Sequence, residues 1–419
     1  MIEQFLKSPR VRRRFERIPL ASVVGAFVAH LNGRGYGRPT IRAYVQAAAH
    51  FGLWLHRSHR SLAQADNTAV EIFLTRHLPH CRCPAPLRRT KPVVRAALHQ
   101  LLVVLRATGV LAERSPLVSP ADVLIAAFKR HLTETCGVAP TTRHYYLREA
   151  RDLLVARFGA GPIDVAALMP TDVRAFVTAR ARVLTPSSTN VVGTAIRSFL
   201  RFLHLEGRAP VGAAFAVPRA ANWRLARLPS ILTDDELAAF LAVFDRAAAI
   251  GRRNYAIALC LSGLGLRAGE VARLTLDDVD WHAGTIAIAP GKSRRGDRLP
   301  LPAHIAEALA DYLRHGRPAT RTRFLFVHHR APYGQGAGPS LVRGAVRFAY
   351  ARIGLGTRFT GTHVLRHTAA TRMLRSGASM KEVADVLRHR SLDTAAIYAK
   401  VDLPTLVGVA LPWPAEVRS

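Results

Sequence analysis

Acidic residues are scarce in this sequence. Asp and Glu number 28 against 60 Lys and Arg, which gives a formal net charge of +32. A chain this cationic attracts polyanions over long distances. A membrane surface also carries negative charge, and a coding bias toward Arg and Ala would explain part of the excess. Arg greatly outnumbers Lys, however, and a guanidinium binds phosphate oxygens in pairs, so the composition favours a nucleic-acid backbone.

Cysteine and long apolar runs are also lacking. Four cysteines in 419 residues exclude a disulfide scaffold and fit a reducing cytosol. No apolar stretch reaches the length of about 18 residues that a membrane span requires. The charged start, Met1 to Arg14, lacks the apolar centre of a secretion signal. We therefore expect a soluble, cytoplasmic protein with no membrane partner.

The hydrophobic fraction, 49%, is sufficient for more than one buried core. The length suits two or three domains. Within the first half, several residues recur at a constant offset (128 − 27 = 101; 145 − 44 = 101). The matching residues are Phe27, Leu31 and Tyr44 in one copy and Phe128, Leu132 and Tyr145 in the other. This recurrence indicates a duplicated helical module, although independent Arg- and Ala-rich helices would produce part of the same likeness.

The composition along the chain predicts four segments. Residues 1–115 and 116–210 contain the two helical copies. Residues 211–229 are rich in Pro and Arg, which predicts a linker. Residues 230–419 form a further domain with a C-terminal tail.

Within that last segment, the sequence predicts helices and one short hairpin. A capping box at Thr233 begins the first helix, and another at Ser379 begins a late one. Residues 285–288 and 298–301 are expected to be strands, because they flank a polar turn. The fold class is therefore mainly α with a small β-hairpin.

Three places in the C-terminal segment combine residues that can act on a phosphate. They are Arg267 with Glu270, His363 with Arg366, and His389 with Tyr398 nine positions later (398 − 389 = 9). Each group alone is common on surfaces or in cores. A helix puts His363 and Arg366 on one face, because they are three residues apart. His389 falls just after the helix that Ser379 begins, which brings the groups toward one another.

This pattern resembles the tyrosine recombinase (phage integrase) family, whose catalytic fold is shared with type IB topoisomerases. The family has Arg, a hairpin Lys, His-x-x-Arg, His and Tyr in that chain order, and Lys292 is the lysine of the predicted hairpin. The resemblance is firm over about 228–406 and looser over 119–208. It implies a catalytic domain preceded by two tandem helical, SAM-like DNA-binding domains.

The resemblance also implies the chemistry. Tyr398 would attack a DNA phosphate to give a 3′-phosphotyrosine, and His363 would share in the transfer of the tyrosine proton. Arg267 and Arg366 would bind the non-bridging oxygens, and His389 would donate a hydrogen bond to the same phosphate. The reaction needs no cofactor and no metal.

Other residues have supporting roles in this interpretation. Lys292 would protonate the departing 5′-oxygen, although its basic surroundings also fit a simple contact to the DNA backbone. Glu270 would orient Arg267. His367 is expected to pack or face solvent, and Arg388 to contact a phosphate.

Further arginines are candidates for DNA contacts. They are Arg143, Arg148 and Arg197 in the second copy, and Arg294 and Arg295 in the hairpin. The first copy would bind a further DNA segment or mediate protein contacts. The expected partner is double-stranded DNA, with a homo-tetramer on two recombination sites and possible accessory proteins or partner recombinases.

Three functions fit these observations to different degrees. The first is a site-specific recombinase of a mobile element, an integrase or transposase. The second is a DNA-relaxing enzyme like the type IB topoisomerases, and the third is a non-catalytic DNA-binding accessory protein. The complete set of six catalytic residues favours an enzyme, and the tandem helical modules favour recombination.

One cluster lies outside this pattern. His77, His80, Cys81 and Cys83 are close in sequence and are residue types that bind zinc, but no second ligand pair follows at the usual spacing. The sequence therefore gives no complete set of metal ligands.

Overall fold

The computed structural model describes most of the chain. The described residues are 19–83, 88–111, 119–159, 161–208, 213–221, 229–289, 297–331, 333, 335–389 and 397–398. Lys292, Arg294 and Arg295 lie outside them. The chain divides into two compact units, one of residues 113–226 and one of residues 1–112 with 227–419. No helix among the described residues is long and apolar enough to cross a membrane.

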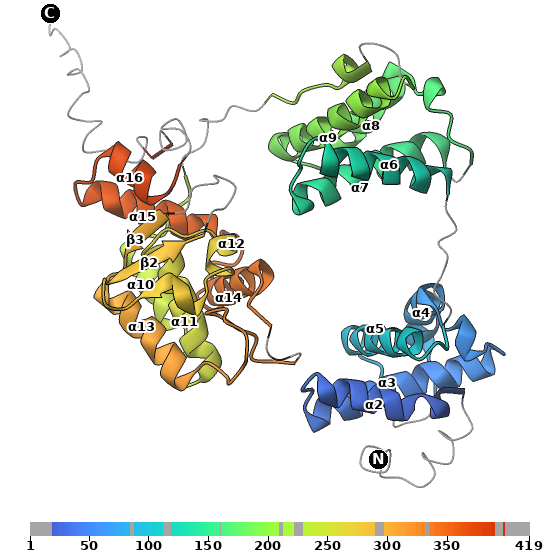
Figure 1. Ribbon diagram of the computed structural model, residues 1–419, viewed down its shortest axis with the longest axis horizontal. Coiled ribbons are helices and arrows are strands. Elements are labelled where there is room, and N and C mark those ends of the chain that lie inside the picture. The colour runs from blue at the N-terminus through green and yellow to red at the C-terminus, as the bar shows by residue number, and fades with distance from the viewer. Residues whose placement is uncertain are drawn as a thin grey trace, which may run out of the picture. The chain divides into compact units, whose positions relative to one another are not determined.

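The first helical segment, residues 19–111, has its own hydrophobic core. Its elements are η2 (Pro19–Ser22), α2 (Val24–Gly33), α3 (Arg38–Arg57), η3 (Leu62–Gln64), α4 (Asn67–Ile72), the π-helical turn η4 (Phe73–His77), η5 (Leu78–His80) and α5 (Lys91–Ala107). Helix α3 packs against α5, and α2 contacts both (Figure 1). Phe27, Phe51 and Phe73 are fully buried there. Burying such side chains stabilises the segment by roughly 1.5–3 kcal/mol each.

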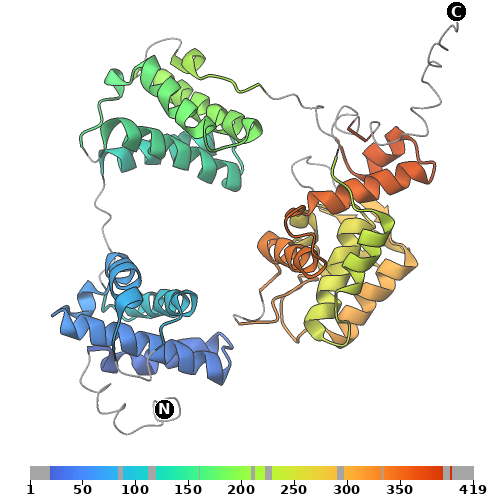
Figure 2. The ribbon, with the colours of Figure 1, turned by 180° about the vertical axis from the view of Figure 1, so that it is seen from behind.

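The second helical segment, residues 119–221, is built in a similar way. Its elements are α6 (Pro120–Glu134), α7 (Pro140–Phe158), η6 (Val165–Ala167), α8 (Pro170–Ala181), α9 (Pro186–Leu205) and η7 (Ala213–Ala216). Each of its four long helices begins with a proline, which suits the first turn because the missing N–H would have no partner there. The four helices lie together in both ribbon views (Figures 1 and 2).

Helix bounds support the duplication. Shifted by 101 positions, α3 would span 139–158 (38 + 101 = 139; 57 + 101 = 158), and α7 is Pro140–Phe158. Phe27 and its counterpart Phe128 are both fully buried, each in the core of its own segment. Phe27 and Phe128 therefore have equivalent places in the cores of their segments.

Part of the predicted linker belongs to the second helical segment. Val217 is buried in that segment's core. Asn190 on α9 donates to the carbonyl of Ala220 at 2.9 Å and accepts from its N–H at 3.0 Å. These contacts hold residues 213–221 against α9. The Pro- and Arg-rich composition predicted a linker, but the stretch also contains apolar side chains that pack in the core.

The C-terminal segment, residues 229–398, surrounds one central helix. Its helices are α10 (Asp234–Ala242), α11 (Ala249–Ser262), α12 (Ala268–Val271), η8 (Leu276–Asp278), α13 (Ala303–His315), α14 (Pro339–Arg352), α15 (His363–Arg375) and α16 (Met380–Val386). Helix α11 contacts α13, α14 and α15 and is buried on most sides. Its run from Ala256 to Leu261 is apolar and buried on all sides, which suits the middle of a core.

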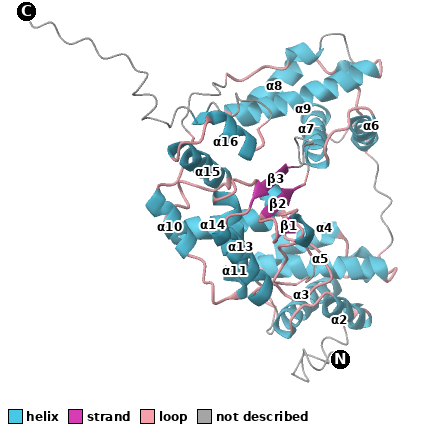
Figure 3. Cartoon of the chain, turned by 60° about the vertical axis from the view of Figure 1, so that its left-hand side comes forward, coloured by secondary structure: helices cyan, strands magenta, loops and turns pink. Residues whose placement is uncertain are grey.

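The strands of the described residues are confined to the C-terminal segment (Figure 3). β1 (Val279–Asp280), β2 (Thr285–Ile288) and β3 (Asp297–Pro300) form an antiparallel sheet in that order. Ile286 lies opposite Val279 on one side and Leu299 on the other, and all three are buried. The predicted hairpin is confirmed, with its second strand one residue earlier than expected. β1 was not predicted, because two residues carry no alternation.

Both predicted capping boxes are present. The Thr233 and Ser379 hydroxyls accept from the backbone N–H of Glu236 and Glu382, which begins α10 and α16 where expected. Helix α15 is attached to the stretch before α10, because the Thr368 hydroxyl accepts from the backbone N–H of Leu232 at 2.9 Å. Helices α12, α15 and α16 carry or border the residues of the candidate site.

Candidate active site

Arg267 is positioned by the start of a very short helix. It is the extended residue before α12, and its backbone N–H donates to Glu270 Oε2 at 2.8 Å. Its guanidinium also donates to Glu270 Oε1 at 2.8 Å. Glu270 is buried, whereas the Arg267 side chain is 40% exposed. The carboxylate therefore fixes the arginine while leaving part of it open to an anion.

Arg366 is buried within α15 and bonded to backbone carbonyls. Its guanidinium donates to Gly265 O at 2.5 Å and to Leu387 O. Gly265 has a φ of +60°, and a Cβ there would meet Leu387 Cδ2 at 2.5 Å. Glycine is thus required for the chain to turn beside Arg366. Burial, aided by nearby Arg267, lowers the pKa of Arg366 to about 10, so it remains cationic near neutral pH.

Arg388 does not have the role expected from the sequence. It adopts a left-handed backbone conformation, with φ 54°, and its guanidinium donates to Glu270 Oε2 at 2.7 Å. Both side chains of this pair are nearly fully buried. The prediction that Arg388 contacts a phosphate is wrong, because the residue is paired inside the protein. Its position beyond α16 turns the chain toward His389.

Glu270 is therefore shared by two arginines. Burial by itself raises the pKa of its carboxyl, but the Arg267 N–H and the Arg388 charge outweigh burial and lower it. The carboxylate stays ionised near neutral pH. It compensates only one of the three cations of Arg267, Arg366 and Arg388, so the surroundings keep a positive field.

Tyr398 is buried between two histidines. Only 2% of the residue is exposed, and it packs on Ala370, Val383 and Leu387. The His389 ring is stacked on it, with ring centroids 6.1 Å apart and an interplanar angle of 11°. Burial raises the pKa of the Tyr398 hydroxyl despite the opposing charges of Arg366 and Arg267.

His367 contacts the tyrosine hydroxyl directly. Its Nδ1 lies 3.0 Å from Tyr398 Oη. The expectation that His367 only packs or faces solvent is therefore wrong. The available sequence signal was its spacing, four residues after His363, which puts both histidines on one face of α15. Their ring centroids are 6.4 Å apart.

The histidines are held in their neutral forms. Burial, followed by the charges of His363 and Arg366, lowers the pKa of His367 to about 4. Burial and the charge of Arg366 lower the pKa of His389 to about 4 as well. Desolvation and the same arginine lower the pKa of His363, although that residue remains exposed. A neutral imidazole can accept a proton from the tyrosine.

The arginines predicted to contact DNA differ in their surroundings. Arg143 donates to Thr133 Oγ1 at 3.1 Å. Arg148 is exposed but pairs with buried Glu149 at 2.7 Å. Arg197 donates to Val217 O at 2.9 Å, so it also holds residues 213–221 in place.

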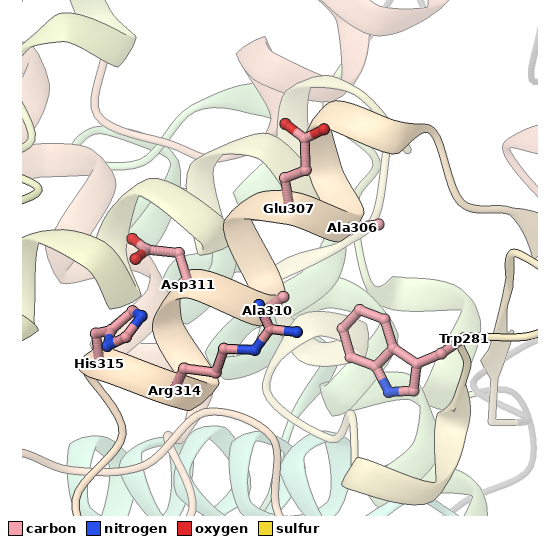
Figure 4. Close-up of a pocket in the computed structure, with 7 residues that line it drawn as sticks. All are labelled: Trp281, Ala306, Glu307, Ala310, Asp311, Arg314 and His315. Atoms are coloured by element: carbon pink, nitrogen blue, oxygen red, sulfur yellow. The ribbon is translucent and has the colours of Figure 1, made fainter.

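A surface pocket of about 410 Å³ lies along α13 (Figure 4). Its lining residues are Trp281, Ala306, Glu307, Ala310, Asp311, Arg314 and His315. It contains two carboxylates and none of the residues around Tyr398. Arg314 and His315 also line the pocket, so its charge is mixed.

The fold and the site together define a class of protein. In it, a helical domain precedes a mainly helical catalytic domain, in which arginines and histidines surround a tyrosine. Residues 230–403 match the phage integrase family, and residues 125–207 match the N-terminal SAM-like domain of phage integrases. The chain is 38% identical over 403 residues to the putative integrase/recombinase y4rA of Sinorhizobium fredii, covering 96% of both proteins. It is 32% identical to tyrosine recombinase XerD of Mycobacterium tuberculosis, covering 66% of this chain and 92% of that protein.

A solved structure agrees in fold. The Tn1549 transposon integrase in complex with transposon right end DNA superposes with a TM-score of 0.54 at 15% identity, covering 68% of this chain and 99% of that one. The chain belongs to the phage integrase family of tyrosine recombinases. It is a site-specific DNA recombinase.

Proposed function

We propose that the chain breaks and rejoins double-stranded DNA through a 3′-phosphotyrosine formed on Tyr398. The observation that carries this assignment is the pairing of Tyr398 Oη with a neutral histidine beside buried Arg366. A tyrosine hydroxyl has an ordinary pKa of about 10, so it needs a proton acceptor and a positive field to act as a nucleophile. Both are present around Tyr398.

The arginines serve the phosphate in this proposal. Arg267 and Arg366 bind the non-bridging oxygens and stabilise the charge that develops in the pentavalent transition state. Arg267 is partly exposed and oriented by Glu270, which suits it to meet an incoming anion. His389 donates a hydrogen bond to the same phosphate. Its Nδ1 is buried and has no partner among the described residues.

Proton transfer involves two histidines of α15. His363 was the candidate from the sequence, and His367 is the one in hydrogen-bond contact with Tyr398. We assign His367 the role of accepting the phenolic proton, with His363 acting on the phosphate side of the same helix. Lys292 protonates the 5′-oxygen as it leaves, and this assignment rests on its place in the sequence pattern.

The buried state of Tyr398 has a consequence for the reaction. A hydroxyl on a residue that is 2% exposed, with a raised pKa, is protonated and shielded from DNA. The hydroxyl must therefore become accessible before it can attack a phosphate. DNA binding exposes it while its contact with His367 is kept, so the free protein does not cleave.

The helical segments hold the DNA. Residues 116–210 contact the backbone through Arg143, Arg148 and Arg197, and the hairpin does so through Arg294 and Arg295. Residues 1–115 bind a further DNA segment or a neighbouring subunit. Two duplexes exchange strands in recombination, so the working unit is a homo-tetramer on two sites, with accessory proteins or partner recombinases where the sites require them.

The biological setting follows from the relatives. The relatives and solved structures include integrases, Xer-type recombinases and a transposon integrase. We propose that the chain integrates or transposes a mobile element, and that it acts in the cytoplasm where bacterial DNA is accessible. Of the predicted linker, residues 211–229, the part 213–221 belongs to the second helical segment, and the catalytic domain, residues 230–419, follows it.

A nicked suicide substrate tests the chemistry. Such a substrate loses a short strand after cleavage, so the covalent protein–DNA complex accumulates and resists denaturing electrophoresis. The wild-type chain should form this complex, and Tyr398→Phe should not. Tyr350→Phe is the matched control, because the Tyr350 hydroxyl is buried without a partner among the described residues and its removal should leave capture unchanged. Capture by Tyr398→Phe at the wild-type level would reject the assignment.

A further inference from the structure

Four metal-binding side chains meet in the first helical segment, outside the recombination site. Ligand atoms of His50, His77, Cys81 and Cys83 all lie within 4.8 Å of one another. His50 is fully buried on α3, and Cys83 is 3% exposed. His77 ends the π-helical turn η4, a type of turn that is frequent at functional sites. The cluster thus connects a long helix to a distant irregular stretch.

Two contacts of His77 have the lengths expected for tetrahedral coordination. Zinc bound by imidazole and thiolate at its usual bond lengths separates two nitrogens by about 3.3 Å and a nitrogen from a sulfur by about 3.6 Å. His77 Nε2 lies 3.3 Å from His50 Nε2 and 3.6 Å from Cys83 Sγ. His50 Nε2 lies 3.0 Å from Cys81 Sγ, slightly closer than that geometry requires.

The outer contacts of His50 direct its lone pair into the cluster. Its Nδ1 lies 3.1 Å from the carbonyl oxygen of Arg88. A carbonyl only accepts, so Nδ1 carries the proton, and the neutral ring offers Nε2 to the cluster. Metal-binding histidines commonly donate their other N–H to a carbonyl in this way.

Hydrogen-bond donors face both sulfurs of the cluster. Arg57 donates to Cys83 Sγ at 3.6 Å, and the backbone N–H of Cys83 donates to Cys81 Sγ at 3.3 Å. Arg89 donates to the Cys83 carbonyl at 2.5 Å. Phe73 packs edge-on against His50 and stacks on His77, which limits the access of water.

We propose that His50, His77, Cys81 and Cys83 form a structural zinc site. Two thiolates and two imidazoles in a compact tetrahedral arrangement suit Zn²⁺, and four protein ligands leave no open position for a substrate. The metal would fasten α3 to the η4–η5 stretch and to the cysteines that precede α5. It would thereby stabilise the first helical segment without taking part in DNA cleavage.

The sequence does not reveal this site because one ligand, His50, is far from the other three along the chain. His50 lies 27 positions before His77 (77 − 50 = 27), and Cys81 and Cys83 are separated by one residue instead of the usual two or more. His80, which the sequence groups with the others, is exposed and outside the cluster. Folding of α3 against the η4–η5 stretch is what completes the ligand set.

Metal analysis of the full-length chain tests the proposal without DNA. Protein purified under reducing conditions and without chelator should contain about one zinc per chain, as expected for a closed four-ligand site. Cys81→Ser with Cys83→Ser should reduce the zinc content to near zero. His80→Ala and Cys136→Ser are the matched controls. They alter an exposed histidine and an exposed cysteine outside the cluster, and should retain the full zinc content.

Cobalt substitution provides a readout that does not depend on how the variants fold. Co²⁺ added to the metal-free wild-type chain should give the visible absorption of a tetrahedral ion and a thiolate charge-transfer band. His80→Ala should give the same spectrum. A wild-type chain that holds no zinc and gives no such spectrum with Co²⁺ would overturn the proposal. Undiminished zinc in the double serine variant would do so as well.

Discussion

At the scale of single residues, His367 is the candidate acceptor of the tyrosine proton. It is the side chain that contacts the Tyr398 hydroxyl, at 3.0 Å, and it is neutral near pH 7. Two histidines on one face of α15 can therefore divide the work of moving the tyrosine proton and binding the phosphate. The contact depends on how residues 397–398 pack against α15 and α16. Spacing along the chain places His367 on the same helix face as His363, but it could not reveal the contact with Tyr398.

We predict that His367→Gln slows single-turnover cleavage by about 100-fold, the lower end of what a general base contributes. The amide can still hydrogen-bond to the tyrosine but cannot take its proton. Rates of covalent complex formation on the nicked substrate, measured across a pH series, check this. His304→Gln, on the exposed side of α13, is the control. An unchanged rate and pH profile for His367→Gln would remove this residue from the chemistry.

The half-buried histidines His367 and His389 also predict how stability changes with pH. The pKa values of His367 and His389 are about 4 in the folded chain, against an ordinary value of about 6.5. The unfolded chain therefore binds protons first as the pH falls. Their contribution to stability is full above about pH 6.5 and is lost as the pH falls toward about 4.

Denaturant unfolding of the DNA-free protein at successive pH values measures this loss. The double variant His367→Asn with His389→Asn should show a shallower decline between pH 6.5 and 4 than the wild-type chain. The reason is that two groups with lowered pKa values have been removed. Equal slopes in the two proteins would contradict the predicted protonation states.

At the scale of elements, the turn before α12 tolerates no side chain at Gly265 without strain. Gly265 has a φ of +60°, a Cβ there would meet Leu387 at 2.5 Å, and its carbonyl accepts from Arg366. Gly265→Ala should therefore displace Arg366 and destabilise the C-terminal segment by about 1–3 kcal/mol.

Thermal unfolding and covalent capture measure the two effects of Gly265→Ala separately. Gly284→Ala is a useful comparison, because Gly284 also has a positive φ, 59°, but has open space where a Cβ would lie. It should share the backbone strain and spare the active site. Wild-type capture by Gly265→Ala would show that the turn does not position Arg366.

Elements with strong local chemistry could be predicted from the sequence. The capping boxes at Thr233 and Ser379 and strand β2 lie where local pattern indicated. The buried Arg388–Glu270 pair and the His50–Cys81 contact join residues 118 and 31 positions apart. Local pattern does not encode such pairs, because they are set by how helices pack.

At the scale of the whole molecule, the charge of +32 predicts strong dependence of DNA binding on salt. Each phosphate contact that is lost should reduce the slope of log affinity against log salt by about 0.9. Arg143→Ala should lower the slope by about that amount, on specific and non-specific DNA alike, because phosphate contacts carry no sequence information. Fluorescence anisotropy over a salt series measures the slope. An unchanged slope would exclude Arg143 as a phosphate contact.

The central claim concerns the atom that holds the DNA during the reaction. Mass spectrometry of the covalent complex, after protease and nuclease digestion, identifies the residue that carries the nucleotide. We predict a single modified peptide containing Tyr398, linked to a 3′-phosphate. A nucleotide attached to any other residue, such as exposed Tyr333, would contradict it.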